Sequence, residues 1–155
     1  MAKKITYKFH HVVLWVADME RSLRFYRDLL GFAPDRVHEP KGEAIDTIFG
    51  KKNARLITAY GTIGGVGLEF VQMIDPPCDE LYTRPGAPLP WRQGPETIAF
   101  DVDDMDAFLA HAKKVGAPLT CPPVTFATGQ RNAFVHDPDG IRLEVIQRTA
   151  TSLDR

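Results

Sequence analysis

HVVLWVADM (residues 11–19) and TIAFDVDDM (residues 97–105) are two nine-residue segments that align without a gap. Each is an apolar run that ends in an Asp-Met pair. Their first positions differ, because the first segment begins with His11 and the second with Thr97. A long segment that recurs in this way predicts a fold built from two similar halves.

The similarity continues into the residues that follow each segment. Apolar residues at helical spacing come next in both halves, and Asp18 and Asp104 suit the N-cap position of a helix. Gly31 and Gly116 stand where a C-terminal glycine would end each helix. We therefore expect one helix after each repeated strand.

A second pair of segments repeats near the end of each half. GLEFVQ (67–72) matches RLEVIQ (142–147), and both have the apolar, β-branched composition of a buried strand. Between the halves, six prolines in twenty residues exclude a helix or a central strand. The predicted organisation is a first module over 8–75, a Pro-rich linker over 76–95, a second module over 94–148 and a frayed tail over 149–155.

Composition limits the classes of function. The chain has 155 residues, a formal net charge of −1 and no long basic run, which argues against nucleic acid as a partner. It has no apolar stretch of the roughly 20 residues that a membrane-spanning helix needs. Cys78 and Cys121 have no metal-site spacing, so we expect free thiols, no membrane association and a cytoplasmic protein.

Strand alternation puts an unusual set of polar residues on one face of the sheet. His11 shares its face of the first strand with Trp15, and Thr97 has the equivalent place in the repeat. Glu69 and Glu144 each stand between apolar neighbours that point the other way. Four equivalent positions, two from each half, are thus predicted to converge on the inner face.

A carboxylate in an apolar strand is costly to bury unless it is paired or binds a cation. Two glutamates at symmetric positions, together with a histidine, are a ligand set that suits a divalent first-row metal ion. The alternative is that Glu69 and Glu144 each pair with an arginine or lie on a solvated sheet face. The internal repeat favours the metal site, and the alternation alone leaves both interpretations open.

The sequence resembles the vicinal oxygen chelate superfamily, which includes glyoxalase I, methylmalonyl-CoA epimerase, extradiol dioxygenases, fosfomycin-modifying enzymes and bleomycin-binding proteins. The resemblance covers residues 8–148. It rests on three segments: HVVLWVADMERSLRFYRDLLGF (11–32), TIAFDVDDMDA (97–107) and FVHDPDGIRLEVIQ (134–147). It implies an α+β fold in which two paired βαβββ modules form a half-open, U-shaped mixed sheet around a metal ion.

The family's usual metal ligands come from the first and last strands of each module, which here are His11, Glu69, Thr97 and Glu144. Many relatives have His or Gln where this chain has Thr97, and a threonine hydroxyl is a poor ligand for such an ion. The resemblance therefore implies one divalent ion (Mn, Fe, Co, Ni, Zn or Mg) on His11, Glu69 and Glu144, with open positions for substrate.

Three activities follow from this resemblance. The preferred one is a metal-dependent, glyoxalase-like lyase or isomerase that acts on a small molecule with adjacent oxygens, with Glu69 or Glu144 moving a proton. The alternatives are a metal-free drug-binding or resistance protein and an extradiol-type dioxygenase, although Thr97 removes the second histidine of the dioxygenase triad. A homodimer is also expected, and the predicted cavity lining is Trp15, Tyr60, Trp91, Thr97 and Arg131.

Overall fold

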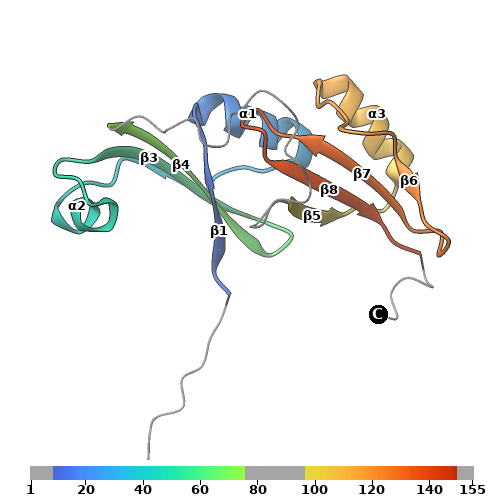
Figure 1. The fold of residues 1–155 in the computed structure, drawn as a ribbon, viewed down its shortest axis with the longest axis horizontal. Coiled ribbons are helices and arrows are strands. Elements are labelled where there is room, and N and C mark those ends of the chain that lie inside the picture. The colour runs from blue at the N-terminus through green and yellow to red at the C-terminus, as the bar shows by residue number, and fades with distance from the viewer. Residues whose placement is uncertain (1–8, 76–96, 150–155) are drawn as a thin grey trace, which may run out of the picture. The chain divides into compact units, whose positions relative to one another are not determined.

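The computed structural model describes residues 9–75 and 97–149, so Trp91, Cys78 and the Pro-rich linker lie outside the described residues. Figure 1 shows its three helices and eight strands. In chain order they are β1 (His11–Trp15), α1 (Met19–Leu30), β2 (Arg36–His38), α2 (Glu43–Phe49), β3 (Arg55–Ile63), β4 (Val66–Asp75), β5 (Thr97–Asp101), α3 (Met105–Val115), β6 (Val124–Thr125), β7 (Arg131–His136) and β8 (Arg142–Gln147).

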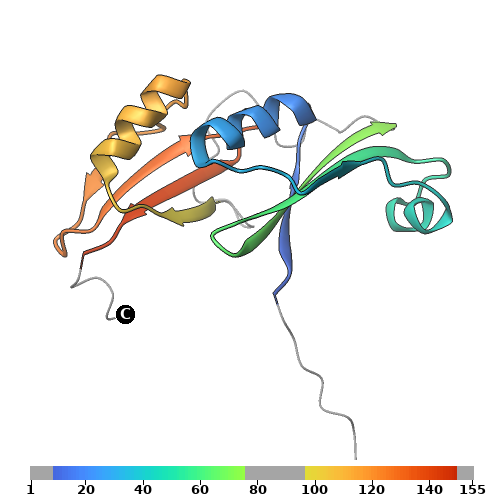
Figure 2. The same ribbon diagram turned by 180° about the vertical axis from the view of Figure 1, so that it is seen from behind.

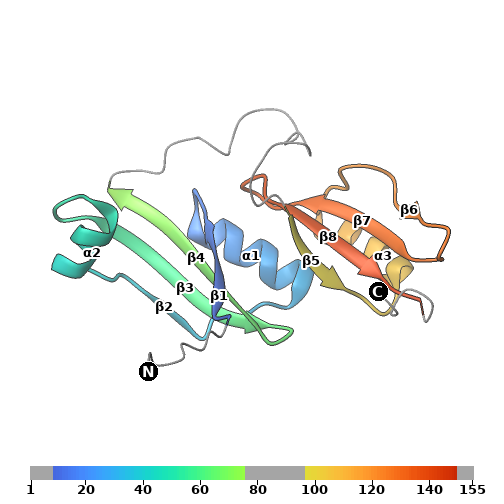
Figure 3. The same ribbon diagram turned by 60° about the horizontal axis from the view of Figure 1, so that its bottom comes forward.

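The strands form two four-stranded sheets with the same topology, ordered β1-β4-β3-β2 and β5-β8-β7-β6, as Figure 3 shows. In each sheet the strand that comes first in the chain (β1 or β5) is parallel to the one that comes last (β4 or β8). The other neighbouring pairs are antiparallel. The registers also match, because Val13 faces Glu69 and Ala99 faces Glu144. The predicted α+β fold with two βαβββ modules is confirmed.

The described chain divides into two compact units, and α1 is grouped with the unit that contains the second sheet. One unit contains β1 to β4 with α2, and the other contains β5 to β8 with α3 and also α1. Within the second unit, α3 lies along one face of the β7–β8 sheet (Figure 2). The helix of the first module is therefore grouped with the sheet of the second.

Alternation along the strands builds the core as the sequence predicts. On one face of each sheet the apolar side chains are almost completely buried. Their neighbours along each strand point to the opposite face, which is more exposed. The buried set is Leu14, Val16, Leu68 and Phe70 in the first unit and Val135, Leu143 and Val145 in the second.

Helix α1 is fixed to the turn between β7 and β8 by a buried polar network. Tyr26 donates a hydrogen bond to Asp137 over 3.0 Å, and Ser22 donates one to Asp139 over 2.6 Å. Arg21 adds an ion pair with Asp139 at 2.7 Å. Burial raises the pKa of Asp137 to about 6, and burial together with the negative charge of Asp137 raises the pKa of Tyr26.

The helix ends follow the predicted signals. Asp104 caps α3 by accepting a hydrogen bond from the backbone N–H of Ala107, and α1 begins directly after Asp18. Gly31 and Gly116 both adopt a left-handed conformation after the last helical turn, with φ of 71° and 75°.

Two glutamines on the last strands have a role that the sequence pattern did not reveal. Because both lie near strand ends, the sequence predicts that Gln72 and Gln147 reach water. Instead, the Gln72 side-chain oxygen accepts a hydrogen bond from the N–H of Met19 over 2.8 Å, and Gln147 does the same for Met105 over 3.1 Å. Each glutamine thus satisfies an N–H group at the start of a helix.

The segments with weak patterns are only partly predicted. The turn signals at Gly64-Gly65 and in the DPDG segment predict two hairpins, which the structure has as β3–β4 and β7–β8. The further strands that the sequence predicts within 34–49 and 117–126 are β2 and β6. Helix α2 was not predicted.

Cys121 is a free thiol. No helix in the described part of the chain is long and apolar enough to cross a membrane.

Candidate metal centre

His11 and Glu69 form a pair on the face of the first sheet that lies opposite its buried apolar side chains. Strands β1 and β4 run in parallel, with His11 beside Gly67 and Val13 beside Glu69. The Nε2 atom of His11 lies 3.1 Å from Oε2 of Glu69, and the two side chains are 29% and 25% exposed. The partner of Glu69 is thus a histidine, which could itself bind a metal.

The absence of a side chain at Gly67 makes room for this pair. A Cβ atom at Gly67 would lie 2.7 Å from the carbonyl oxygen of His10, 2.9 Å from Cβ of His11 and 2.9 Å from the hydroxyl oxygen of Tyr60. Tyr60 faces Glu69 across β3 and β4, and its ring meets the His11 ring edge-on at 5.9 Å. Tyr60 therefore lies beside the pair, as predicted for a lining residue.

His10 also belongs to this cluster. Because neighbouring residues alternate along a strand, the sequence predicts that His10 points away from His11. Strand β1, however, begins only at His11, and the Nδ1 atoms of the two histidines are 2.6 Å apart. Alternation does not apply to a residue that precedes the strand, so sequence reasoning placed His10 on the wrong side.

Glu144 has a different set of neighbours in the second unit. Its Oε1 atom accepts a hydrogen bond from Asn132 over 2.5 Å, and Gln130 donates to Asn132 over 2.9 Å. Asn132 is buried, so Gln130 and Asn132 hold one carboxylate oxygen of Glu144 from within the sheet. Sequence reasoning missed Asn132, although it lies two residues before Phe134, which faces Glu144.

The position equivalent to His11 holds a smaller side chain. Thr97 is half-buried and faces Arg142 across β5 and β8, where the first sheet has His11 and Gly67. The guanidinium carbon of Arg142 lies 3.9 Å from the centroid of the Phe134 ring. The two halves therefore share a backbone plan, and the position equivalent to His11 carries a threonine in the second half.

Two other predicted lining residues have clear locations. Trp15 is on the same face as His11, and its ring meets that of Phe49 edge-on at 5.7 Å. Arg131 makes an ion pair with Asp106 of α3 at 2.7 Å, which lowers the pKa of that carboxyl group. Arg131 precedes Asn132 on β7, so it lies on the helix-covered face, opposite to Glu144.

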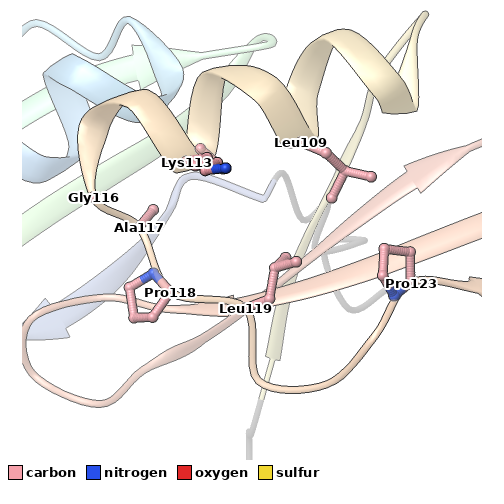
Figure 4. Close-up of a pocket in the computed structure, with 8 residues that line it drawn as sticks. Leu109, Lys113, Gly116, Ala117, Pro118, Leu119 and Pro123 are labelled. Atoms are coloured by element: carbon pink, nitrogen blue, oxygen red, sulfur yellow. The ribbon is translucent and has the colours of Figure 1, made fainter.

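A cavity in the second unit lies away from these residues. It measures about 570 Å³ and lies between α3 and the loop that follows (Figure 4). Leu119 of this loop pairs with Val135, which is on the face of the sheet opposite to Glu144. Its lining carries no carboxylate or imidazole, which makes it unsuited to metal chemistry: Leu109, Ala112, Lys113, Gly116, Ala117, Pro118, Leu119 and Pro123.

The donor atoms fit a metal ion in part. Within the described residues, no group of three or more His, Cys, Asp or Glu side chains comes together as a ready metal site. His11 and Glu69 nevertheless supply an imidazole nitrogen and a carboxylate oxygen at one point, which suits two positions of a borderline divalent ion. A third protein ligand would have to join this pair.

Comparison with known proteins settles the family. Residues 8–145 match the sequence model of the Glyoxalase/Bleomycin resistance protein/Dioxygenase superfamily. The chain belongs to this superfamily. The relationship covers both modules, and it includes every residue of the His11–Glu69 and Asn132–Glu144 pairs.

Relatives of this glyoxalase-superfamily chain align with it over most of both chains. It is 31% identical to the uncharacterized protein YaeR of Escherichia coli over 90% of this chain and 95% of YaeR. A glyoxalase family protein from Bacillus cereus has a TM-score of 0.80 at 20% identity, over 95% of this chain and 97% of the other. The fosfomycin resistance protein FosX from Mesorhizobium loti has a TM-score of 0.55 at 21% identity, over 97% and 100%. These two structures support the fold.

Proposed function

We propose that the protein is a divalent-metal-dependent lyase or isomerase of the glyoxalase type, acting on a small molecule that carries adjacent oxygens. The observation that carries this proposal is the 3.1 Å approach of His11 Nε2 to Glu69 Oε2 on the face of the first sheet opposite its buried apolar side chains. Membership of a superfamily named for glyoxalases and dioxygenases gives the pair its chemical context.

The proposed ligands are His11, Glu69 and Glu144. Two carboxylates and one neutral imidazole balance the charge of a divalent ion and leave coordination positions for substrate or water. When bound, the ion would polarise the adjacent oxygens of the substrate and stabilise negative charge that develops on them. Asn132 binds Oε1 of Glu144, so Oε2 is the oxygen that we assign to metal binding.

Proton transfer is assigned to one of the two glutamates. Glu69 Oε2 lies against an imidazole nitrogen, and Glu144 Oε1 accepts a hydrogen bond from a buried amide. Either carboxylate could take a proton from a carbon next to the chelated oxygens and return it at the neighbouring carbon. The base is the residue whose replacement by glutamine stops exchange of substrate hydrogen with deuterated water while the protein still binds metal.

The decisive experiment is elemental analysis of protein purified without an affinity tag, with wild type beside His11→Ala and Glu144→Ala. About one divalent ion per chain, lost in both variants, supports the proposed ligand set. An Arg131→Ala variant is the matched control, because Arg131 pairs with Asp106 and should retain the ion. A wild-type protein that holds no ion, and takes up none from Mn, Fe, Co, Ni, Zn or Mg, would rule out this function.

The second candidate is a metal-free binding protein. It is favoured because, within the described residues, no three His, Cys, Asp or Glu side chains are arranged as a ready metal site. A ligand that raises the melting temperature equally with and without a chelating agent would support it. The dioxygenase alternative has no such observation in its favour, because Thr97 stands where a second histidine would be needed.

The homodimer also stays a proposal, which light scattering tests.

A further inference from the structure

Apolar side chains continue the face of β1 that carries His11. Side chains on one face of a strand recur every second residue, which places Val13 and Trp15 next along this face. They are 39% and 43% exposed, whereas Leu14 on the opposite face is 6% exposed. Two large apolar residues thus stay accessible on the face where the proposed chemistry occurs.

Helix α2 adds a third side chain to this face. Phe49, its last residue, meets the Trp15 ring edge-on, with ring centroids 5.7 Å apart and planes at 90°. This is a favourable geometry for two aromatic rings. None of the residues of α2 is buried, so the helix is not held by the core.

Local polar contacts hold α2 instead. The carboxylate of Asp46 accepts hydrogen bonds from the backbone N–H groups of Asn53 and Ala54, over 2.9 and 3.0 Å. Lys51 pairs with Asp75 of β4, and Gly50 ends the helix in a left-handed conformation. With no fully buried residue and with these ties near its C-terminal end, α2 places Phe49 against Trp15.

We propose that Val13, Trp15 and Phe49 form an apolar platform that binds the hydrocarbon part of the substrate. This inference rests on the proposed function, since the adjacent oxygens of the substrate would bind at His11 and Glu69. It specifies the substrate class: molecules in which an aryl or similarly bulky apolar group is attached to the chelating oxygens. Small hydrophilic dicarbonyl compounds would leave the platform exposed to water.

The dimensions agree with this assignment. Neighbouring side chains on one strand face are about 7 Å apart, so Val13 is one step and Trp15 two steps from His11. One aromatic ring spans the first step, and a fused pair of rings spans most of both. Three side chains are also far fewer than the 20–30 residues that each partner of a typical protein interface contributes, which favours a small molecule over a second copy of the chain.

The test uses hydroxamic acids, which share one pair of chelating oxygens and differ in their apolar group. Acetohydroxamic, benzohydroxamic and 2-naphthohydroxamic acid are titrated by calorimetry into Ni-loaded protein. We expect the affinity to rise along this series by about tenfold or more, since each added ring buries apolar surface. Trp15→Ala and Phe49→Ala should remove most of the rise, so that the three compounds bind with similar affinity.

Ile48→Ala is the matched control. Ile48 precedes Phe49 on the same helix and is 69% exposed, so its loss removes apolar surface without touching Trp15. It should retain the full preference for the naphthyl compound. Trp15→Phe serves if Trp15→Ala does not fold, and it should retain part of the preference. Equal affinity for the three compounds, or the same preference in Trp15→Ala and wild type, would overturn the platform.

Failure of the metal site can be told apart from failure of the platform. If no ion binds, the metal-dependent function is wrong, and the platform is then tested with 2-naphthol and metal-free protein. Binding that Trp15→Ala abolishes would keep the platform, and absence of binding would refute it. If Trp15→Ala instead converts a dimer into a monomer in light scattering, the face is a subunit interface and the proposal is wrong.

Discussion

The imidazole of His11 lies between two partners, with Nε2 3.1 Å from Oε2 of Glu69 and Nδ1 2.6 Å from Nδ1 of His10. The two contacts constrain the position of the proton. A metal ion on Nε2 requires the proton on Nδ1, which would then donate it to His10. Without metal, a hydrogen bond from His11 to Glu69 requires the proton on Nε2, and His10 would then be the donor to Nδ1. Metal binding would thus reverse the hydrogen bond between the two histidines.

Replacing His10 should therefore weaken metal binding without removing a metal ligand. Loss of the group that orients a ligating histidine typically lowers metal affinity about 10–100-fold. We expect His10→Ala to fall in this range in a titration against a competing chelator. Phe9→Ala is the control, because Phe9 is the preceding residue and is highly exposed. An unchanged affinity in His10→Ala would show that His10 has no part in the site.

The second half of the proposed site depends on Asn132. Its amide donates to Glu144 Oε1 and accepts from Gln130, and it is buried. Asn132→Leu has a similar volume but no donor, so Glu144 would lose its fixed orientation and metal affinity should fall about tenfold or more. Gln130→Met removes only the outer contact and should have a smaller effect. Equal losses in the two variants would mean that Asn132 does not position Glu144.

Much of this arrangement could be predicted from the sequence, because it depends on periodic patterns. Alternation gave the faces of β1, β4 and β8, and the repeat gave the equivalence of Glu69 and Glu144. Contacts between distant segments could not be found in this way. Asn132 and Gln72 look like ordinary polar residues near strand ends, and only the pairing of strands and helices reveals their hydrogen bonds.

Helix α2 was missed for a related reason. Its sequence, EAIDTIF, has only seven residues, so the helical spacing of Ile45, Ile48 and Phe49 is too short a pattern to indicate a helix on its own. Its stability comes from the Asp46 hydrogen bonds to Asn53 and Ala54, which no periodicity records. The residue that α2 contributes to the face that carries His11, Phe49, was therefore absent from the predicted lining.

The buried turn that holds α1 makes stability depend on pH. Burial raises the pKa of Asp137 from its usual value near 4 to about 6 in the folded protein. Between these values the folded state binds more protons than the unfolded state, so the contribution of Asp137 to the free energy of unfolding falls as pH rises. The full shift corresponds to about 3 kcal/mol, as an order of magnitude.

Urea unfolding at pH 4 and pH 7 checks this dependence. Asp137→Asn cannot ionise, so its stability relative to wild type should be greater at pH 7 than at pH 4. Tyr26→Phe should instead be less stable relative to wild type at pH 7 than at pH 4. The Tyr26 hydrogen bond lowers the pKa of Asp137, and its loss leaves the ionised carboxylate less stabilised. The pKa of Asp106 is lowered, so its contribution to the free energy of unfolding is lost only at more acidic pH. Parallel pH profiles for wild type and Asp137→Asn would refute this role.

The last prediction concerns the difference between the halves, His11 in one and Thr97 in the other. If Thr97 marks a missing ligand, restoring an imidazole should strengthen the site. Thr97→His alone would meet Arg142, which faces it across β5 and β8, whereas His11 faces Gly67. The double variant Thr97→His, Arg142→Gly reproduces the first half, and the repeat then predicts an imidazole beside Glu144 as His11 lies beside Glu69.

We expect this double variant to bind Ni or Zn about tenfold or more tightly than wild type, because one more nitrogen ligand joins the ion. Thr97→Asn, Arg142→Gly controls for the space that the arginine leaves, since an amide is a weak ligand for these ions. The affinity is measured by competition with a chelator of known strength. If His and Asn at position 97 give the same affinity, Thr97 does not stand at a metal position, and the two halves do not share one centre.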